Sequence, residues 1–128
     1  MSKLRDALCN SIKDHYPTIS AKADAEYFRQ WGDFAGEEYY SYSWFEALAN
    51  ALNREMCNGI PASNFIDLFA TVSANYSQGD EDIRKAIDVA FVENLFWQVP
   101  GSKAVDYWAT LPDTLKQLYV NFHHRTPL

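Results

Sequence analysis

The sequence lacks the features of a membrane or secreted protein. No apolar run reaches the roughly 18 to 20 residues that a helix needs to cross a bilayer. The first 17 residues, MSKLRDALCNSIKDHYP, interrupt their apolar positions with charges every few residues, which excludes the apolar core of a signal peptide. Cys9 and Cys57 are the only cysteines, and without a secretory signal we expect free thiols rather than a disulfide. These absences predict a cytoplasmic protein.

Recognisable catalytic motifs are also missing. The chain has no Gly-rich phosphate loop, no G-x-S-x-G elbow, no H-E-x-x-H helix and no Cys/His set at zinc spacing. The histidines are His15, His123 and His124, and adjacent helical residues point about 100° apart, so the last two cannot easily share a metal ion. Together with Arg125 they complement a helix dipole, while a metal or general-base role stays open. We expect no enzyme activity, no metal and no cofactor.

The residues that are present favour one helical core. Of the 128 residues, 48% are hydrophobic and 16% are aromatic, which suits a single domain spanning residues 1–128. Apolar residues recur at helical spacing, and we find no convincing strand or internal repeat. The sequence therefore predicts an all-α domain of about six helices besides one short one. The expected ranges are 2–15, 19–31, about 43–58, 63–77, 80–98, a short helix to about 110, and a last helix from about 112.

The helix expected near residues 80–98 is predicted to be the central, most buried one. Its run AIDVAFVENLFWQV is apolar around most of the helix, which places Phe91, Leu95 and Trp97 in the core. Glu93 is the exception, because the residues three and four positions away on either side are all apolar. A buried carboxylate must find a donor or take up a proton. We expect Glu93 to be a buried polar residue bound to another helix, with a perturbed acid/base as the open alternative.

The charge is unevenly distributed along the chain. The net charge is −6; residues 1–23 contribute +2 (four basic, two acidic), residues 24–53 contribute −5 (one basic, six acidic), and residues 54–128 contribute −3 (six basic, nine acidic). A negative field repels phosphate backbones and anionic membranes and attracts basic surfaces. We therefore expect a basic protein partner, with no nucleic acid and no membrane as partners.

The stretch EEYYSYSWFEA, residues 37–47, combines five aromatic rings with three carboxylates. Ser43 stands three residues before Glu46, the spacing of a capping box, and predicts a helix start there. Trp44 or Phe45 and one tyrosine are expected in the core, but five rings cannot all face inward from one element. The alternation of Tyr and Ser also suits a strand, which we reject because no partner strand exists. The predicted partner-binding surface comprises Asp33, Glu37, Glu38, Tyr39, Tyr40 and Tyr42.

Several of these segments carry a resemblance. The capped WFEALANAL, the GIPASNF link, the acidic helix start and AFVENLFW resemble a family of small bacterial all-helical proteins of unassigned function, over about residues 40–99. In general character the chain is also similar to immunity proteins, the small acidic antitoxins made beside bacterial toxins, including those of contact-dependent growth inhibition. That second likeness implies no particular residue as a binding residue.

The sequence thus leads to a functional hypothesis with an alternative. We expect an immunity protein that binds and neutralises a basic toxin domain, a nuclease in the most concrete version, through the acidic aromatic surface. The alternative is a small helical adaptor or regulatory domain without a toxin partner. A small enzyme acting through Glu93 or a histidine is the third hypothesis.

Overall fold

The computed structural model describes residues 2–32 and 39–128 and is all-α, as predicted. No strand occurs in these two ranges. The elements are α1 (Lys3–His15), α2 (Pro17–Trp31), α3 (Tyr40–Cys57), η1 (Ala62–Phe65), α4 (Ile66–Gln78), α5 (Glu81–Lys85), η2 (Ala86–Phe91), η3 (Val92–Asn94), α6 (Gly101–Thr110) and α7 (Asp113–His123). In the described part of the chain, no helix is both long enough and apolar enough to span a membrane.

The ends of the helices follow local sequence signals. The Ser2 side chain accepts a hydrogen bond from the backbone N–H of Arg5 and caps α1. Pro17 occupies the first turn of α2, where its missing N–H costs nothing. Gly79 follows α4, and a Cβ added there would lie 2.5 Å from the carbonyl oxygen of Asn75. A glycine is therefore required at this close approach between α4 and α5.

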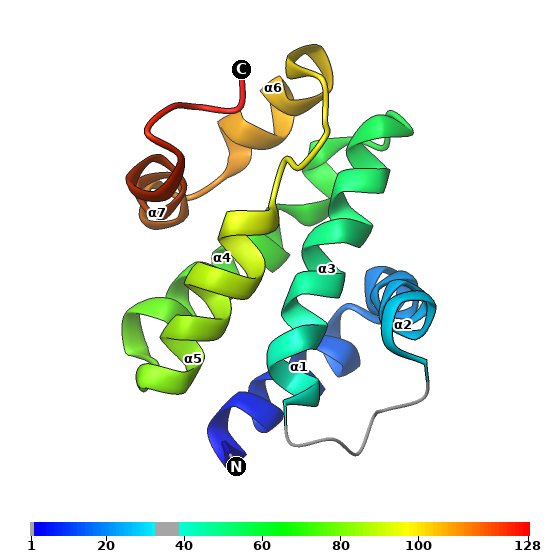
Figure 1. Cartoon of the computed structure of the whole chain (residues 1–128). Helices are drawn as coiled ribbons and strands as arrows, with labels where there is room; N and C mark the ends of the chain where they lie inside the picture. The colour runs from blue at the N-terminus through cyan, green and yellow to red at the C-terminus, as the bar shows by residue number, and fades with distance from the viewer. Residues whose placement is uncertain (1, 33–38) are drawn as a thin grey trace.

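Helix α3 runs through the middle of the molecule. Its side chains Trp44, Phe45, Leu48 and Leu52 are completely buried. The helix packs against α1 and α2 on one side and against η2 on the other, as Figure 1 shows for the teal to green helix at the centre. Burying large apolar side chains on both sides makes α3 the principal source of core stability. Trp44 and Phe45 are thus core residues, which confirms that part of the prediction.

The buried helical segment predicted near residues 80–98 is present, but it ends early and changes its winding. It begins as an α-helix at Glu81, widens to a π-helix from Ala86 to Phe91, and tightens to a 3₁₀ turn that ends at Asn94. Phe91 and Leu95 are buried, as predicted. Trp97 is 66% exposed, so the prediction that it lies in the core is wrong. The chain leaves the helical path after Asn94 and carries Trp97 outward.

Candidate functional site

Tyr39 lies at the surface, at the start of α3. Its side chain is 65% exposed, and its carbonyl accepts a hydrogen bond from the Ser43 N–H at 3.0 Å. Helix α3 therefore begins at Tyr40, three residues before the predicted capping box. Ser43 lies inside the helix and does not cap it, so the capping-box prediction is wrong. Of the predicted partner-binding residues, Asp33, Glu37 and Glu38 lie outside the described residues.

Tyr40 is only partly exposed and is held by neighbouring side chains. Its hydroxyl accepts a hydrogen bond from Lys13 at 2.6 Å, and its ring packs edge-on against Tyr27 with centroids 4.7 Å apart. Burial raises the pKa of Tyr40, although the hydrogen bond from Lys13 opposes this shift. Asp24 joins the cluster through an ion pair with Lys13 at 3.3 Å and a hydrogen bond from the Trp44 indole at 2.8 Å. Tyr40 thus holds α1 and α2 against α3, and less of its side chain is free to contact a partner protein.

Tyr42 is half-buried among carboxylates. Burial raises the pKa of its hydroxyl, and the negative charges of Glu93 and Glu46 raise it further. The guanidinium of Arg5 lies 5.9 Å from the centre of the Tyr42 ring, within cation–π range. Tyr42 therefore borders an acidic face formed by α3 and the segment after the π-helix.

Glu93 is half-buried rather than buried, which corrects the prediction. Burial raises its pKa, and the nearby charge of Asp88 adds to the shift; burial raises the pKa of Asp88 as well. The π-helix explains the proximity, because its hydrogen bonds join residues five apart and bring such side chains toward the same side. No described side chain donates a hydrogen bond to the Glu93 carboxylate. Glu93 therefore contributes to the acidic face and is not the internal polar link that its apolar neighbours suggested.

Sequence reasoning missed two exposed aromatic residues at the end of α2. The helical spacing of Ala23, Tyr27, Phe28 and Trp31 predicts that these four side chains form the apolar face of this helix. Phe28 is 64% exposed and Trp31 is 44% exposed, so the prediction is wrong for these two residues. They are three residues apart and so share one side of α2. The contact between Tyr27 and Tyr40 brings the end of α2 against the start of α3, so Tyr39 belongs to the same end of this helix pair. We call Phe28, Trp31 and Tyr39 the aromatic end.

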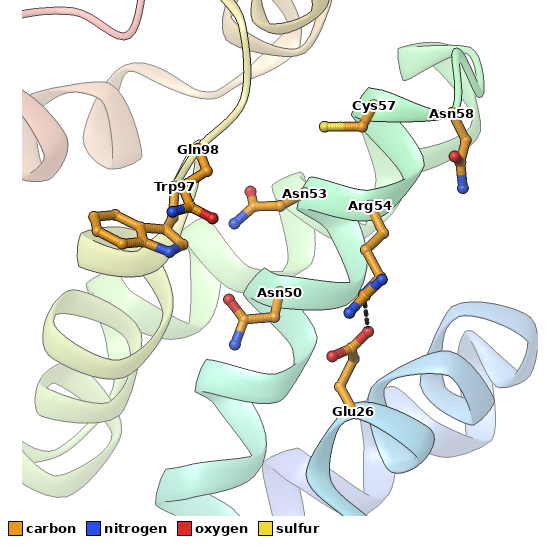
Figure 2. A pocket seen from close by; sticks show the side chains of 8 residues that line it. All are labelled: Glu26, Asn50, Asn53, Arg54, Cys57, Asn58, Trp97 and Gln98. Atoms are coloured by element: carbon orange, nitrogen blue, oxygen red, sulfur yellow. Dashed lines mark ion pairs between the residues drawn. The ribbon is translucent and has the colours of Figure 1, made fainter. Parts of the chain in front are cut away.

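A pocket opens near the other end of α3, beside Trp97. Its volume is about 480 Å³, and its lining includes Glu26, Asn50, Asn53, Arg54, Trp97 and Gln98. Figure 2 shows the Trp97 indole on one side, the α3 asparagines in the middle and the Arg54–Glu26 pair on the other side. We call this the Trp97 pocket. The pocket could not be predicted from the sequence, because its position depends on where the chain leaves the helix after Asn94.

Backbone hydrogen bonds to Asn53 hold Trp97 in place. The Asn53 side chain accepts from the Phe96 N–H at 2.7 Å and donates to the Asn94 carbonyl at 2.8 Å. Phe96 and Gln98, on either side of Trp97, have positive φ angles of 67° and 56°. Residues other than glycine adopt such angles only at a cost of about 1 to 3 kcal/mol. The backbone on both sides of Trp97 is therefore strained, and in this conformation the Trp97 side chain is exposed to solvent.

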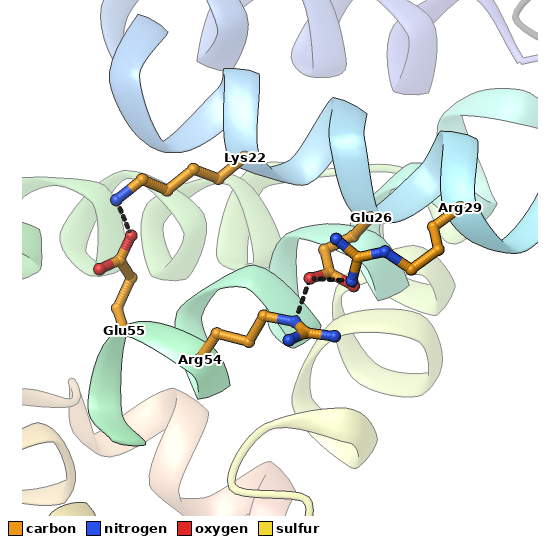
Figure 3. Close-up of polar contacts among 5 residues, drawn as sticks. All are labelled: Lys22, Glu26, Arg29, Arg54 and Glu55. Carbon is orange, nitrogen blue, oxygen red and sulfur yellow. Dashed lines mark hydrogen bonds and ion pairs between the residues drawn. The ribbon is translucent and has the colours of Figure 1, made fainter. Parts of the chain in front are cut away.

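Ion pairs along the seam between α2 and α3 border this pocket. Lys22 pairs with Glu55, which is almost completely buried. Arg54 and Arg29 both pair with the single carboxylate of Glu26, the latter at 3.1 Å (Figure 3). These five side chains comprise three cations and two carboxylates, which leaves one positive charge in excess. This seam is a local exception to the acidic character of the chain.

Comparison with known proteins connects the chain to a family. The family described as "Domain of unknown function (DUF7674)" matches residues 9–125. The chain belongs to this family. No curated protein and no solved structure matches it. The family match covers both the aromatic end and the Trp97 pocket, so both surfaces belong to the DUF7674 domain itself.

Two histidines of this DUF7674 domain contact backbone carbonyl groups, and both of its cysteines are free thiols. His15 contacts the Ser11 carbonyl through Nδ1 at 2.8 Å, and His123 contacts the Glu93 carbonyl through Nε2 at 3.2 Å. No group of His, Cys, Asp or Glu within the described ranges could hold a metal ion. Both cysteines are free, as predicted, with Cys9 buried and Cys57 exposed at the edge of the Trp97 pocket.

Proposed function

We propose that this DUF7674 protein is a binding protein that neutralises a basic protein partner, as an immunity protein neutralises its toxin. The observation that carries the proposal is the aromatic end. Three large aromatic side chains, Phe28, Trp31 and Tyr39, are exposed on either side of a stretch of sequence with three carboxylates. Tyrosine and tryptophan are the residue types that most often dominate binding energy at protein interfaces.

The electrostatics favour a basic partner. Glu46, Asp88 and Glu93 surround Tyr42 closely enough that their charges help to raise its pKa. These three carboxylates make this part of the surface acidic. The sequence between Trp31 and Tyr39 carries three further carboxylates, Asp33, Glu37 and Glu38. Such a field steers a basic protein toward the aromatic end and raises its association rate at low salt. Nuclease domains are basic because they bind phosphate backbones, which makes a nuclease toxin the most concrete partner.

The proposal places the protein in the cytoplasm. The two free thiols are compatible with the reducing cytoplasm, where an immunity protein would meet a toxin that has entered the cell. The small adaptor domain is the alternative in this setting. It would use the same surface, and only the activity of the partner distinguishes the two.

The experiment combines capture with matched variants. The tagged protein is purified from its native host, the basic protein bound to it is identified by mass spectrometry, and the affinity is measured with purified components. We expect the double variant Trp31→Ala/Tyr39→Ala to weaken binding by about 30-fold, from about 1 kcal/mol for each ring. The control Ile66→Ala/Val105→Ala removes two exposed apolar side chains elsewhere and should leave the affinity unchanged.

The outcomes separate the hypotheses. A partner that stops growth when expressed alone, and is tolerated when this chain is co-expressed, supports the immunity function. A harmless partner bound through the aromatic end favours the adaptor. If the control variant weakens binding and the double variant does not, the aromatic end is the wrong surface.

A further inference from the structure

The Trp97 pocket is built like a site for a small molecule, and its α3 side lies away from the aromatic end. Arg54 follows Tyr39 by 15 positions along α3, which corresponds to about 22 Å at 1.5 Å per residue. A volume of about 480 Å³ falls within the range of ligand pockets, about 300 to 1,000 Å³. The pocket is therefore large enough for a small molecule, and Glu26 at its edge lies two positions before Phe28 of the aromatic end.

The Trp97 indole offers a flat apolar face in solvent. Such exposure is normally avoided, and here the positive φ angles of its two neighbours add strain. Asn53 stabilises this strained backbone conformation, because its side chain hydrogen-bonds to the backbone of Asn94 and Phe96, just before Trp97. An exposed indole on a backbone held in this way offers a stacking platform for a planar ring, because offset-stacked rings gain energy beyond the burial of their surface.

The floor and rim of the pocket carry carboxamides. Asn50 and Gln98 each present a donor and an acceptor in one plane, and neither side chain has a hydrogen-bond partner among the described residues. Adjacent donor and acceptor groups of this kind match the edge of a nucleobase, which Asn and Gln read through paired hydrogen bonds. The carboxamides are uncharged, so they suit an uncharged ring edge.

Arg54 supplies a positive charge at the opposite side of the pocket. Its Nε atom pairs with Glu26, while its two Nη atoms have no partner in the described part of the chain. Since Arg29 shares the same carboxylate, one positive charge on this seam is not neutralised (Figure 3). A guanidinium with two free N–H edges matches the oxygens of a phosphate. The net charge of −6 opposes a polyanion but not a single phosphate beside this excess charge.

We propose that the Trp97 pocket binds a nucleoside monophosphate. The base stacks on Trp97, its edge hydrogen-bonds to Asn50 and Gln98, and the phosphate binds the Nη atoms of Arg54. Figure 2 shows Trp97 and Gln98 on one side of the pocket, Asn50 in the middle and Arg54 on the opposite side. The proposal concerns a second site and is independent of the partner that binds the aromatic end.

The test is titration calorimetry of the whole protein with AMP, GMP, CMP and UMP, and with adenosine and inorganic phosphate as comparators. We expect at least one monophosphate to bind, and to bind more tightly than either comparator. Trp97→Ala should weaken that binding by about 5- to 150-fold, since stacking on an aromatic side chain contributes about 1 to 3 kcal/mol per base. Trp97→Phe keeps a ring face and should retain most of the affinity. Trp31→Ala, which removes an exposed indole outside the pocket, should have no effect.

A second pair of variants tests the phosphate contact. Arg54→Gln should reduce the affinity for the monophosphate to that of the nucleoside, while Arg54→Lys retains part of the difference. All variants are first checked for an unchanged helical spectrum and melting temperature. The proposal is overturned if no monophosphate binds at millimolar concentration, if adenosine binds as tightly as AMP, or if Trp97→Ala and Trp31→Ala have equal effects.

Discussion

Replacement of Asn53 by alanine tests the hydrogen bonds that hold the turn at Trp97. Asn53 is 6% exposed, and its side chain serves one donor and one acceptor of the backbone, at Phe96 and Asn94. Each buried polar group left without a partner costs about 1 to 3 kcal/mol. Water from the pocket can reach part of this site and offset some of the loss. We therefore expect Asn53→Ala to lower the free energy of unfolding by about 2 to 4 kcal/mol.

The measurement is urea unfolding followed by circular dichroism and, separately, by tryptophan fluorescence. Asn50→Ala is the matched control, because Asn50 lies on the same helix, lines the same pocket and makes no side-chain hydrogen bond with the described residues. It should change stability by less than about 0.5 kcal/mol. If Asn53→Ala costs less than about 1 kcal/mol, or no more than the control, then the two hydrogen bonds do not hold the turn and our account of Trp97 fails.

Three further predictions concern the core, the thiols and the acidic face. Leu95→Ala should cost about 2 to 5 kcal/mol in urea unfolding because this side chain is 1% exposed, and a loss below about 1 kcal/mol would contradict its burial. A thiol reagent should modify Cys57 rapidly in the native protein but not Cys9, since burial raises the pKa of the Cys9 thiol to about 12; equal rates would refute this. The folded-state pKa of Glu93 is raised by burial and by the charge of Asp88, so its ionisation costs stability as the pH rises through that pKa. Glu93→Gln should therefore raise stability at pH 7 and have little effect at pH 3; a loss at pH 7 would show a stabilising contact of the carboxylate.

The helical architecture could be predicted because its signals are local. Ser2 and Pro17 set helix ends through the bonds that they make or lack, and the helices predicted over 2–15 and 19–31 agree with α1 and α2 to within two residues at each end. Trp44 and Phe45 follow the apolar stripe of α3 into the core. In each case the residues that decide the outcome lie within one or two helical turns of each other.

The candidate sites could not be predicted in the same way, because long-range contacts decide them. The run around Glu93 is apolar on all sides, and nothing between Asn94 and Val99 is a glycine or proline that would end the helix. The helix ends there because Asn53, more than 40 positions earlier, bonds to the turn. Phe28 shows a simpler error: it follows Tyr27 directly, and since adjacent residues diverge by about 100°, the burial of Tyr27 turns Phe28 toward solvent.

The π-helix from Ala86 to Phe91 has a consequence for comparing members of this family. A wide turn holds more residues than an α-helical turn of the same height. A relative one residue shorter in this stretch could close it as a regular α-helix without disturbing the elements before it. The side chains that follow would keep their direction, because an α-helical turn with one residue fewer rotates the chain about as far as the wider turn does, and the counterpart of Glu93 would lie four positions after Asp88, still on the same face. A one-residue gap between Asp88 and Glu93 in an alignment would therefore mark a change in helix winding that leaves the acidic face in place.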